Sequence, residues 1–136
     1  MIVVLDSEAF NALAGPASVR EQRVRRILRT ANRLGHEAVV PTLVLAELYR
    51  GRGHNQLVDA CMARERASLT ARDSDRGLAR IVGGVLAAAS AGSAMIVDAH
   101  VVALAVDAGG GVVVTGDPDD LRRLAGPYRH ITVEPC

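Results

Sequence analysis

Short runs of β-branched and other apolar residues alternate with longer segments of helical periodicity along this chain of 136 residues. Residues 2–5 and 112–115 are too short for helices and are typical of buried parallel strands. In residues 18–34, by contrast, apolar side chains recur with a period of 3.6, as on one face of a helix. Because strands that alternate with helices favour a parallel sheet covered on both faces, the pattern predicts an α/β fold.

The same reading predicts each element by its boundaries. Strands are expected at residues 2–5, 37–40, 112–115 and 131–133, with a weak one at 67–70. Helices are expected at residues 7–14, 18–34, 43–49, 54–66, 74–90, 96–108 and 119–125. Thr42 is expected to cap the third helix, and Gly83 and Gly84 to interrupt the fifth. The length fits a single domain over residues 1–136.

The basic residues limit the chemistry available to the protein. All 16 are arginine, against 15 acids, which gives a net charge of +1. The absence of lysine excludes Schiff-base chemistry and a P-loop lysine. A net charge so close to zero means that nucleic-acid binding must depend on a local patch. Arg25, Arg29 and Arg33 form one candidate patch at helical spacing, for contact with RNA or a protein partner, and a solvated helix face explains them equally well.

The remaining composition points to an intracellular protein. Cys61 and Cys136 have no metal-binding or disulfide spacing, so a reducing cytoplasm is the expected location. Cys61 is expected in the core, and Cys136 at a frayed end. The first residues lack the basic segment of a signal peptide, and no apolar run approaches the roughly 20 residues of a membrane span. Membrane association is therefore not expected.

Four acids lie where the sequence is otherwise apolar: Asp6, Glu47, Asp98 and Asp117. Charged groups are seldom buried unless they are paired or bound to metal. Asp6, Asp98 and Asp117 each have a local alternative as the cap of a following helix. Glu47 lies inside a helix and can cap nothing, and its pairing with Arg50 or Arg52 would need a polar surface that this helix hardly offers. A hard divalent cation, Mg²⁺ or Mn²⁺, accounts for all four together.

The surrounding residues favour metal-assisted hydrolysis over other chemistry. A bound metal lowers the pKa of its water and stabilises charge on a phosphodiester under attack. The Thr115 hydroxyl is placed to orient a ligand or a water. The chain contains no GxSxG, HExxH, GxGxxG or P-loop motif, and Asp6-Ser7-Glu8 departs from the DxD of aspartyl phosphatases. With only three aromatic residues, base stacking is not expected to hold an RNA strand.

Four motifs in order carry a resemblance to a known family. They are the strand ending in Asp6, PTLVLAEL at 41–48, DAHVVALA at 98–105 and VTGDPDDL at 114–121. In this order and spacing they resemble a PIN domain, and specifically the VapC toxins of bacterial toxin–antitoxin pairs. Glycine at 116 is a tolerable change from the family pattern in a turn.

The resemblance implies a fold, an activity and a site. The fold is a three-layer α/β/α arrangement around a mostly parallel sheet of four or five short strands, forming one PIN domain over residues 1–136. The activity is Mg²⁺- or Mn²⁺-dependent endoribonuclease action by a homodimer that a VapB-type antitoxin inhibits. Asp6, Glu47, Asp98 and Asp117 are then the catalytic and metal-binding acids, with Asp6 and Asp98 in direct contact, and Thr115 and Asp120 in support.

Two other functions are compatible with the sequence. One is a PIN-like module that binds RNA or a partner without cleavage, and the intact acids argue against it. A structure-specific or DNA-directed nuclease of the same fold is the other alternative.

Overall fold

A five-stranded parallel sheet forms the centre of the protein, for which a computed structural model describes residues 1–136. Its strands are β1 (Ile2–Leu5), β2 (Glu37–Pro41), β3 (Thr70–Arg72), β4 (Gly111–Thr115) and β5 (Ile131–Pro135). They lie in the order β3-β2-β1-β4-β5, and every neighbouring pair is parallel. The sheet order reverses between β1 and β4, and a ligand crevice is expected outside the carboxyl ends of strands at such a point.

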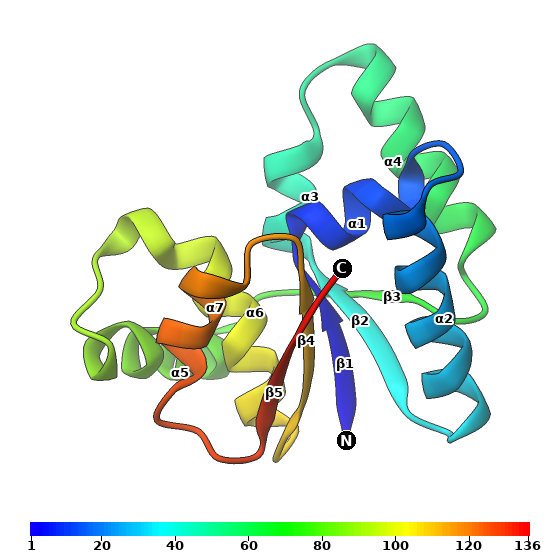
Figure 1. The fold of residues 1–136 in the computed structure, drawn as a ribbon. Helices are drawn as coiled ribbons and strands as arrows, with labels where there is room; N and C mark the ends of the chain where they lie inside the picture. The colour runs from blue at the N-terminus through cyan, green and yellow to red at the C-terminus, as the bar shows by residue number, and fades with distance from the viewer.

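Helices cover the sheet on both sides (Figure 1). On one side lie α1 (Ser7–Ala14), α2 (Val19–Arg33), α3 (Thr42–Leu48) and α4 (Arg52–Arg64). On the other lie α5 (Arg76–Ala88), α6 (Ile96–Asp107) and α7 (Pro118–Ala125), with a 3₁₀ turn at Ser93–Met95 before α6. The three-layer α/β/α fold expected from the sequence is thus confirmed. None of these helices has the length and apolar character needed to cross a membrane.

The core explains why the short apolar runs become strands. All four residues of β1 are buried, because β1 is the central strand and has helices against both faces. Helix α6 is buried over seven consecutive residues from Ala99, so it lacks the polar stripe of a surface helix. His100 belongs to this buried stretch, where Nδ1 bonds the Ile96 carbonyl oxygen and Nε2 bonds Ser74.

Four local expectations are wrong. The edge strand β3 covers residues 70–72 and not 67–70, because it is exposed and carries no apolar signal. Gly83 and Gly84 do not interrupt α5, whose core side chains hold it continuous. Thr42 is the first residue of α3 and caps nothing. Cys136 does not fray, since its backbone N–H donates to the Thr115 carbonyl oxygen at 2.8 Å.

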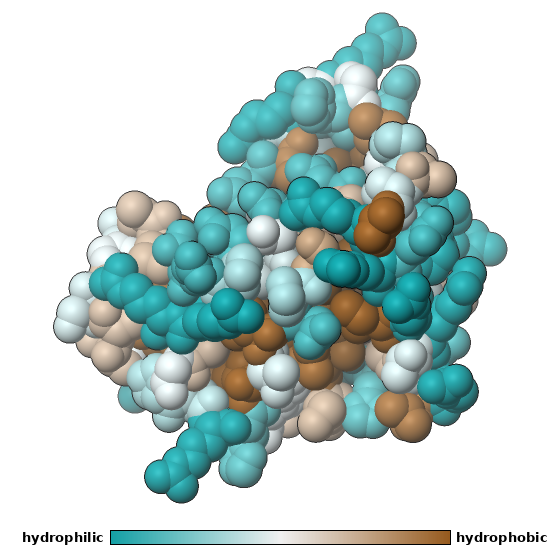
Figure 2. Space-filling model, in the orientation of Figure 1, coloured by the Kyte–Doolittle hydropathy of each residue, from teal (hydrophilic) through white to brown (hydrophobic).

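One part of the surface is apolar. Figure 2 shows hydrophobic side chains reaching the surface between the two helical layers. A groove there is lined by Val3 and Val112 of the sheet and by Ile27 and Leu34 on the α2 side. Helix α2 therefore covers this face of the sheet less completely at β4 than at β2.

Candidate active site

Asp6 joins the central strand to the first helix. It is 5% exposed, and its Oδ1 accepts a hydrogen bond from the Ala9 backbone N–H at 2.8 Å, which caps α1. Burial raises the pKa of Asp6, hydrogen bonds from the Thr115 side chain and the Ala9 backbone oppose that rise, and the charge of Glu8 adds to it. Asp6 therefore caps α1 and is at the same time a buried acid with a raised pKa.

Asp98 lies in the first turn of α6 and is half-buried. Its pKa is raised to about 6, first by burial and then by four other carboxylates: Asp6, Asp120, Glu47 and Asp117. These four residues come from the end of β1, from α3 and from the loop and helix after β4, so three separate parts of the chain direct negative charge at Asp98 of α6. We call Asp6, Glu47, Asp98, Asp117 and Asp120 the acidic cluster.

Glu47 reaches the cluster from α3. The Ser7 hydroxyl donates a hydrogen bond to Glu47 Oε2, which links α3 to the start of α1. The expectation that this helix offers little polar surface is wrong, since Glu47 is exposed and only Val44 and Leu45 of the helix are buried. Helix α3 has only seven residues, and the two that it buries make up part of one turn.

The segment after β4 supplies the remaining members. Thr115 is fully buried, and its Oγ1 accepts the Asp117 backbone N–H at 2.9 Å. Asp117 occupies the N-cap position of α7, but its side chain makes no capping hydrogen bond. Asp98 does not cap α6 either, because that helix begins at Ile96. The local alternatives therefore fail for Asp98, which is half-buried, and for Asp117, which is exposed.

The donors suit a hard divalent cation by chemistry. Every charged side chain that acts on Asp98 is a carboxylate, and Mg²⁺ and Mn²⁺ prefer oxygen ligands. No group of three or more His, Cys, Asp or Glu side chains is arranged to hold a metal ion by itself. Mg²⁺ commonly takes one or two carboxylates and completes its shell with water and substrate phosphate, so a full protein cage is not required.

The arginines of the candidate patch differ in their surroundings. Arg25 is paired with Glu21 at 2.6 Å and with the buried Glu65 at 2.8 Å, and these bonds raise the pKa of its guanidinium. Arg29 and Arg33 are exposed on α2. The charge of Arg25 is therefore already neutralised within the protein, whereas that of Arg29 and Arg33 is not.

Three residues around the acidic cluster were not expected from the sequence. They are Ser7, which bonds Glu47, Glu8, whose charge acts on Asp6, and Arg20, which pairs with Glu8 at 3.4 Å. Ser7 and Glu8 directly follow Asp6, and that adjacency was the one available signal. Nothing in the sequence marks Arg20, because only the fold brings the start of α2 to this edge.

Comparisons with known proteins agree with this architecture. The fold is similar to a crystal structure of VapBC2 from Rickettsia felis bound to a DNA fragment from their promoter, with a TM-score of 0.66 and 14% identity over 100% of this chain and 99% of that one. No curated protein shows significant similarity to the sequence. The family model of the PIN domain matches residues 3–127. This chain belongs to the PIN domain family.

Proposed function

We propose that this protein is a Mg²⁺- or Mn²⁺-dependent endoribonuclease, and that it acts as the toxin of a type II toxin–antitoxin pair. Its single PIN domain extends over residues 1–136. Membership of the PIN family supports the nuclease activity. Similarity of fold to a VapBC2 structure supports the toxin role and a VapB-type antitoxin as partner. We further propose a homodimer that works in the cytoplasm.

One observation supports the activity most strongly. Burial first, and then four carboxylates remote in the sequence, raise the pKa of Asp98 to about 6. Such mutual repulsion destabilises a folded protein unless a cation offsets it. The cluster also lies outside the carboxyl ends of β1 and β4, where parallel α/β folds bind ligands.

The residues of the chain have distinct roles in this proposal. Asp6 and Asp98 would hold the metal directly, with Glu47 and Asp117 completing the shell through water or carboxylate oxygens. The bound ion supplies Lewis acidity and a water of lowered pKa. Thr115 orients Asp6 through its hydroxyl, and Ser7 orients Glu47. The Ala9 N–H donates to Asp6 Oδ1 and helps to fix the orientation of this carboxylate.

The test is cleavage of RNA by conservative variants. Asp6→Asn and Asp98→Asn keep side-chain size, and asparagine retains the capping ability of residue 6. We expect Mn²⁺-dependent cleavage to fall by about 10²-fold or more in each variant, with circular dichroism and thermal unfolding showing that the fold is intact. Asp75→Asn is the matched control, because Asp75 caps α5 outside the cluster.

Two outcomes would contradict this proposal. Equal cleavage by the parent and both variants would show that the acidic cluster is not catalytic. Binding of RNA without cleavage by the parent would favour a module that only sequesters RNA.

A comparison of RNA with DNA of the same sequence separates a ribonuclease from a DNA-directed nuclease of the same fold. Coexpression with the gene product of a small neighbouring reading frame tests the antitoxin.

A further inference from the structure

Arg20 is the arginine that contacts the residues around the acidic cluster. Its Nη2 lies 3.4 Å from Glu8 Oε2, and its Nε donates to the Cys136 carbonyl oxygen at 3.3 Å. The backbone N–H of Cys136 in turn bonds the Thr115 carbonyl oxygen. The charges of Asp6 and Arg20 both act on the Cys136 thiol, and this agrees with their proximity. Arg20 therefore places a positive charge beside the acids.

The partners of Arg20 hold it weakly. Both hydrogen bonds are longer than the usual 2.9–3.0 Å, and the side chains of Arg20 and Glu8 are about half exposed, at 52% and 51%. An exposed ion pair of this kind contributes little to stability. The guanidinium is thus free to exchange a protein carboxylate for another anion at little cost.

Gly116 makes room for this pair. A Cβ at position 116 would clash with Nη2 of Arg20 and Oε2 of Glu8. The glycine lies between Thr115 and Asp117, in the loop that supplies the acidic cluster. The sequence marks Gly116 only as a tolerable turn residue. In the structure, its lack of a side chain leaves the space that the Arg20 guanidinium occupies beside the acidic cluster.

A groove continues from this point. It has a volume of about 380 Å³ and runs between α1, the turn at Gly15 and Pro16 and the first turn of α2, with Glu8 and Arg20 among its lining. That volume is in the range of small-ligand pockets, about 300–1,000 Å³. Only one of its seven lining residues is hydrophobic, and Glu8 and Arg20 give it charged groups that a hydrated strand can contact.

We infer that Arg20 binds a backbone phosphate of the RNA next to the scissile one, and that the groove between α1 and α2 holds the attached nucleotide. This inference rests on the proposed function. Arginine provides a planar fork of donors that matches phosphate. When no RNA is bound, Glu8 pairs with the Arg20 guanidinium. When RNA binds, its phosphate replaces the Glu8 carboxylate. Arg20 is a substrate-binding residue: it holds the strand beside the acidic cluster equally in the ground state and the transition state, and it takes no part in bond cleavage.

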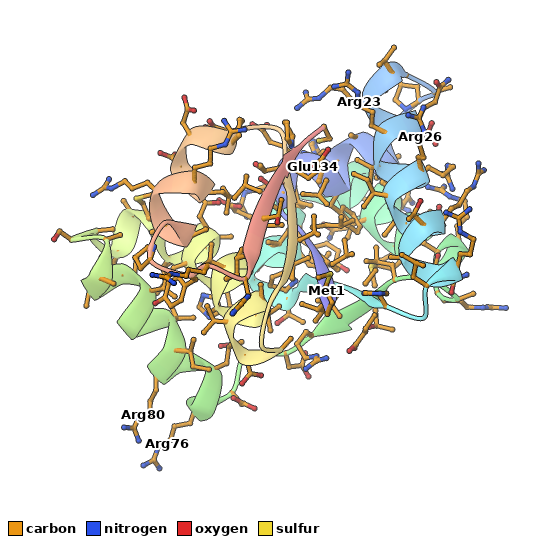
Figure 3. The ribbon with its side chains drawn as sticks, turned by 60° about the horizontal axis from the view of Figure 1, so that its bottom comes forward. Met1, Arg23, Arg26, Arg76, Arg80 and Glu134 are labelled. Atoms are coloured by element: carbon orange, nitrogen blue, oxygen red, sulfur yellow. The ribbon has the colours of Figure 1, made fainter.

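The other arginines of α2 lie elsewhere. Arg23 and Arg26 line a separate groove with Glu134 of β5 (Figure 3). Arg25 is paired with Glu21 and Glu65. Neither group bonds Glu8 or Cys136, the two residues that hold Arg20 next to the acidic cluster.

Two substitutions with opposite expected effects test the inference. RNA affinity is measured by fluorescence anisotropy of a labelled RNA stem–loop, in EDTA and in an Asp98→Asn background, which prevents cleavage and lowers repulsion. Arg20→Ala should weaken binding about tenfold and reduce the slope of log affinity against log salt by about 0.7. Glu8→Gln should strengthen binding, because it removes a competing carboxylate.

Two further variants serve as control and as independent check. Arg80→Ala removes the same charge from α5, where the side chain extends away from α2 (Figure 3), and should leave affinity unchanged. Gly116→Ala, measured in the Glu8→Gln background, should weaken RNA binding relative to Glu8→Gln alone, because the competing carboxylate is already gone and the added methyl displaces the guanidinium. Neither Arg20→Ala nor Gly116→Ala should change Mn²⁺ uptake.

Cleavage kinetics in the otherwise unaltered protein complete the test. Arg20→Ala should raise KM about tenfold with kcat nearly unchanged, as expected for lost substrate binding. The inference is overturned if Arg20→Ala leaves both affinity and KM at parental values, if Glu8→Gln and Arg20→Ala weaken binding alike, or if the Asp98→Asn background does not bind RNA. A parent that binds RNA through Arg20 but never cleaves it would overturn the proposed function and leave the phosphate contact standing.

Discussion

Asp98 is the residue at which the energetic cost of the acidic cluster is concentrated. Its pKa is raised to about 6, by burial first and then by the four neighbouring carboxylates. The folded state therefore favours the neutral acid more than the unfolded state does. Asp98 contributes stability below its usual pKa of 3.8, and that contribution is lost as the pH rises through about 6.

This sign gives a prediction for the metal-free protein. In EDTA, the free energy of unfolding of Asp98→Asn should match that of the parent near pH 4 and exceed it by on the order of 2 kcal/mol near pH 7. Urea denaturation at several pH values measures the difference. Saturating Mn²⁺ should reduce the gap at pH 7, because the parent gains binding energy that the variant lacks. A parent more stable than the variant in EDTA at pH 7 would contradict the pKa shift.

Among single residues, the sequence identifies four members of the acidic cluster but gives no sign of Arg20. Asp6, Glu47, Asp98 and Asp117 are recognisable because each interrupts an apolar run. The structure brings them together, but their metal contacts remain a prediction. Arg20 is not recognisable, because its partners Glu8 and Cys136 lie 12 and 116 residues away.

The helix starts separate capping acids from acids of the cluster. Asp75 accepts the Leu78 N–H at 2.8 Å and caps α5, whereas Asp117 holds the same position before α7 and bonds nothing there. Asp75→Ala should therefore cost about 1 kcal/mol of unfolding free energy. Asp117→Ala should cost less than about 0.5 kcal/mol and yet lower RNA cleavage. A loss of stability in Asp117→Ala as large as that in Asp75→Ala would mean that Asp117 is structural.

The pairing of α2 with the end of α4 gives another contrast. Arg25 bonds the buried Glu65 at 2.8 Å, and the remaining partner of that carboxylate, Arg64, lies at 3.5 Å. Arg25→Ala leaves a buried carboxylate poorly paired, so we expect a loss of about 2 kcal/mol. Arg29→Ala, on the exposed face of the same helix, should stay within about 0.5 kcal/mol of the parent. Thermal and urea unfolding of the two variants test this difference.

The boundaries of elements with a strong hydrophobic period are predictable from sequence, whereas those of the edge strand are not. Strand β1 and helix α1 have the boundaries expected from sequence, because a buried apolar run and a following cap define both. Strand β3 is shifted, since an exposed three-residue edge strand depends on its pairing with β2 and not on its own side chains. The continuity of α5 across Gly83 and Gly84 likewise comes from packing, which outweighs the low helix propensity of glycine.

At the scale of the whole molecule, the strand order of the sheet brings the acidic cluster together. Because β1 and β4 are neighbours in the sheet but far apart in the sequence, their carboxyl ends bring Asp6 and the Thr115–Asp117 loop together. Helix α6 packs against both strands and adds Asp98, and α3 adds Glu47. The family and the three layers are predictable from motif order, whereas the proximity of the acids and the groove beside Arg20 arise only from the folded chain.

Calorimetric titration with Mn²⁺ tests the central claim most directly. We predict saturable uptake by the parent, loss of that saturable phase in Asp6→Asn and Asp98→Asn, and parental uptake by Asp75→Asn, in which asparagine preserves the cap of α5. No saturable uptake by the parent, or equal uptake by the parent and Asp98→Asn, would contradict a metal site built from these carboxylates.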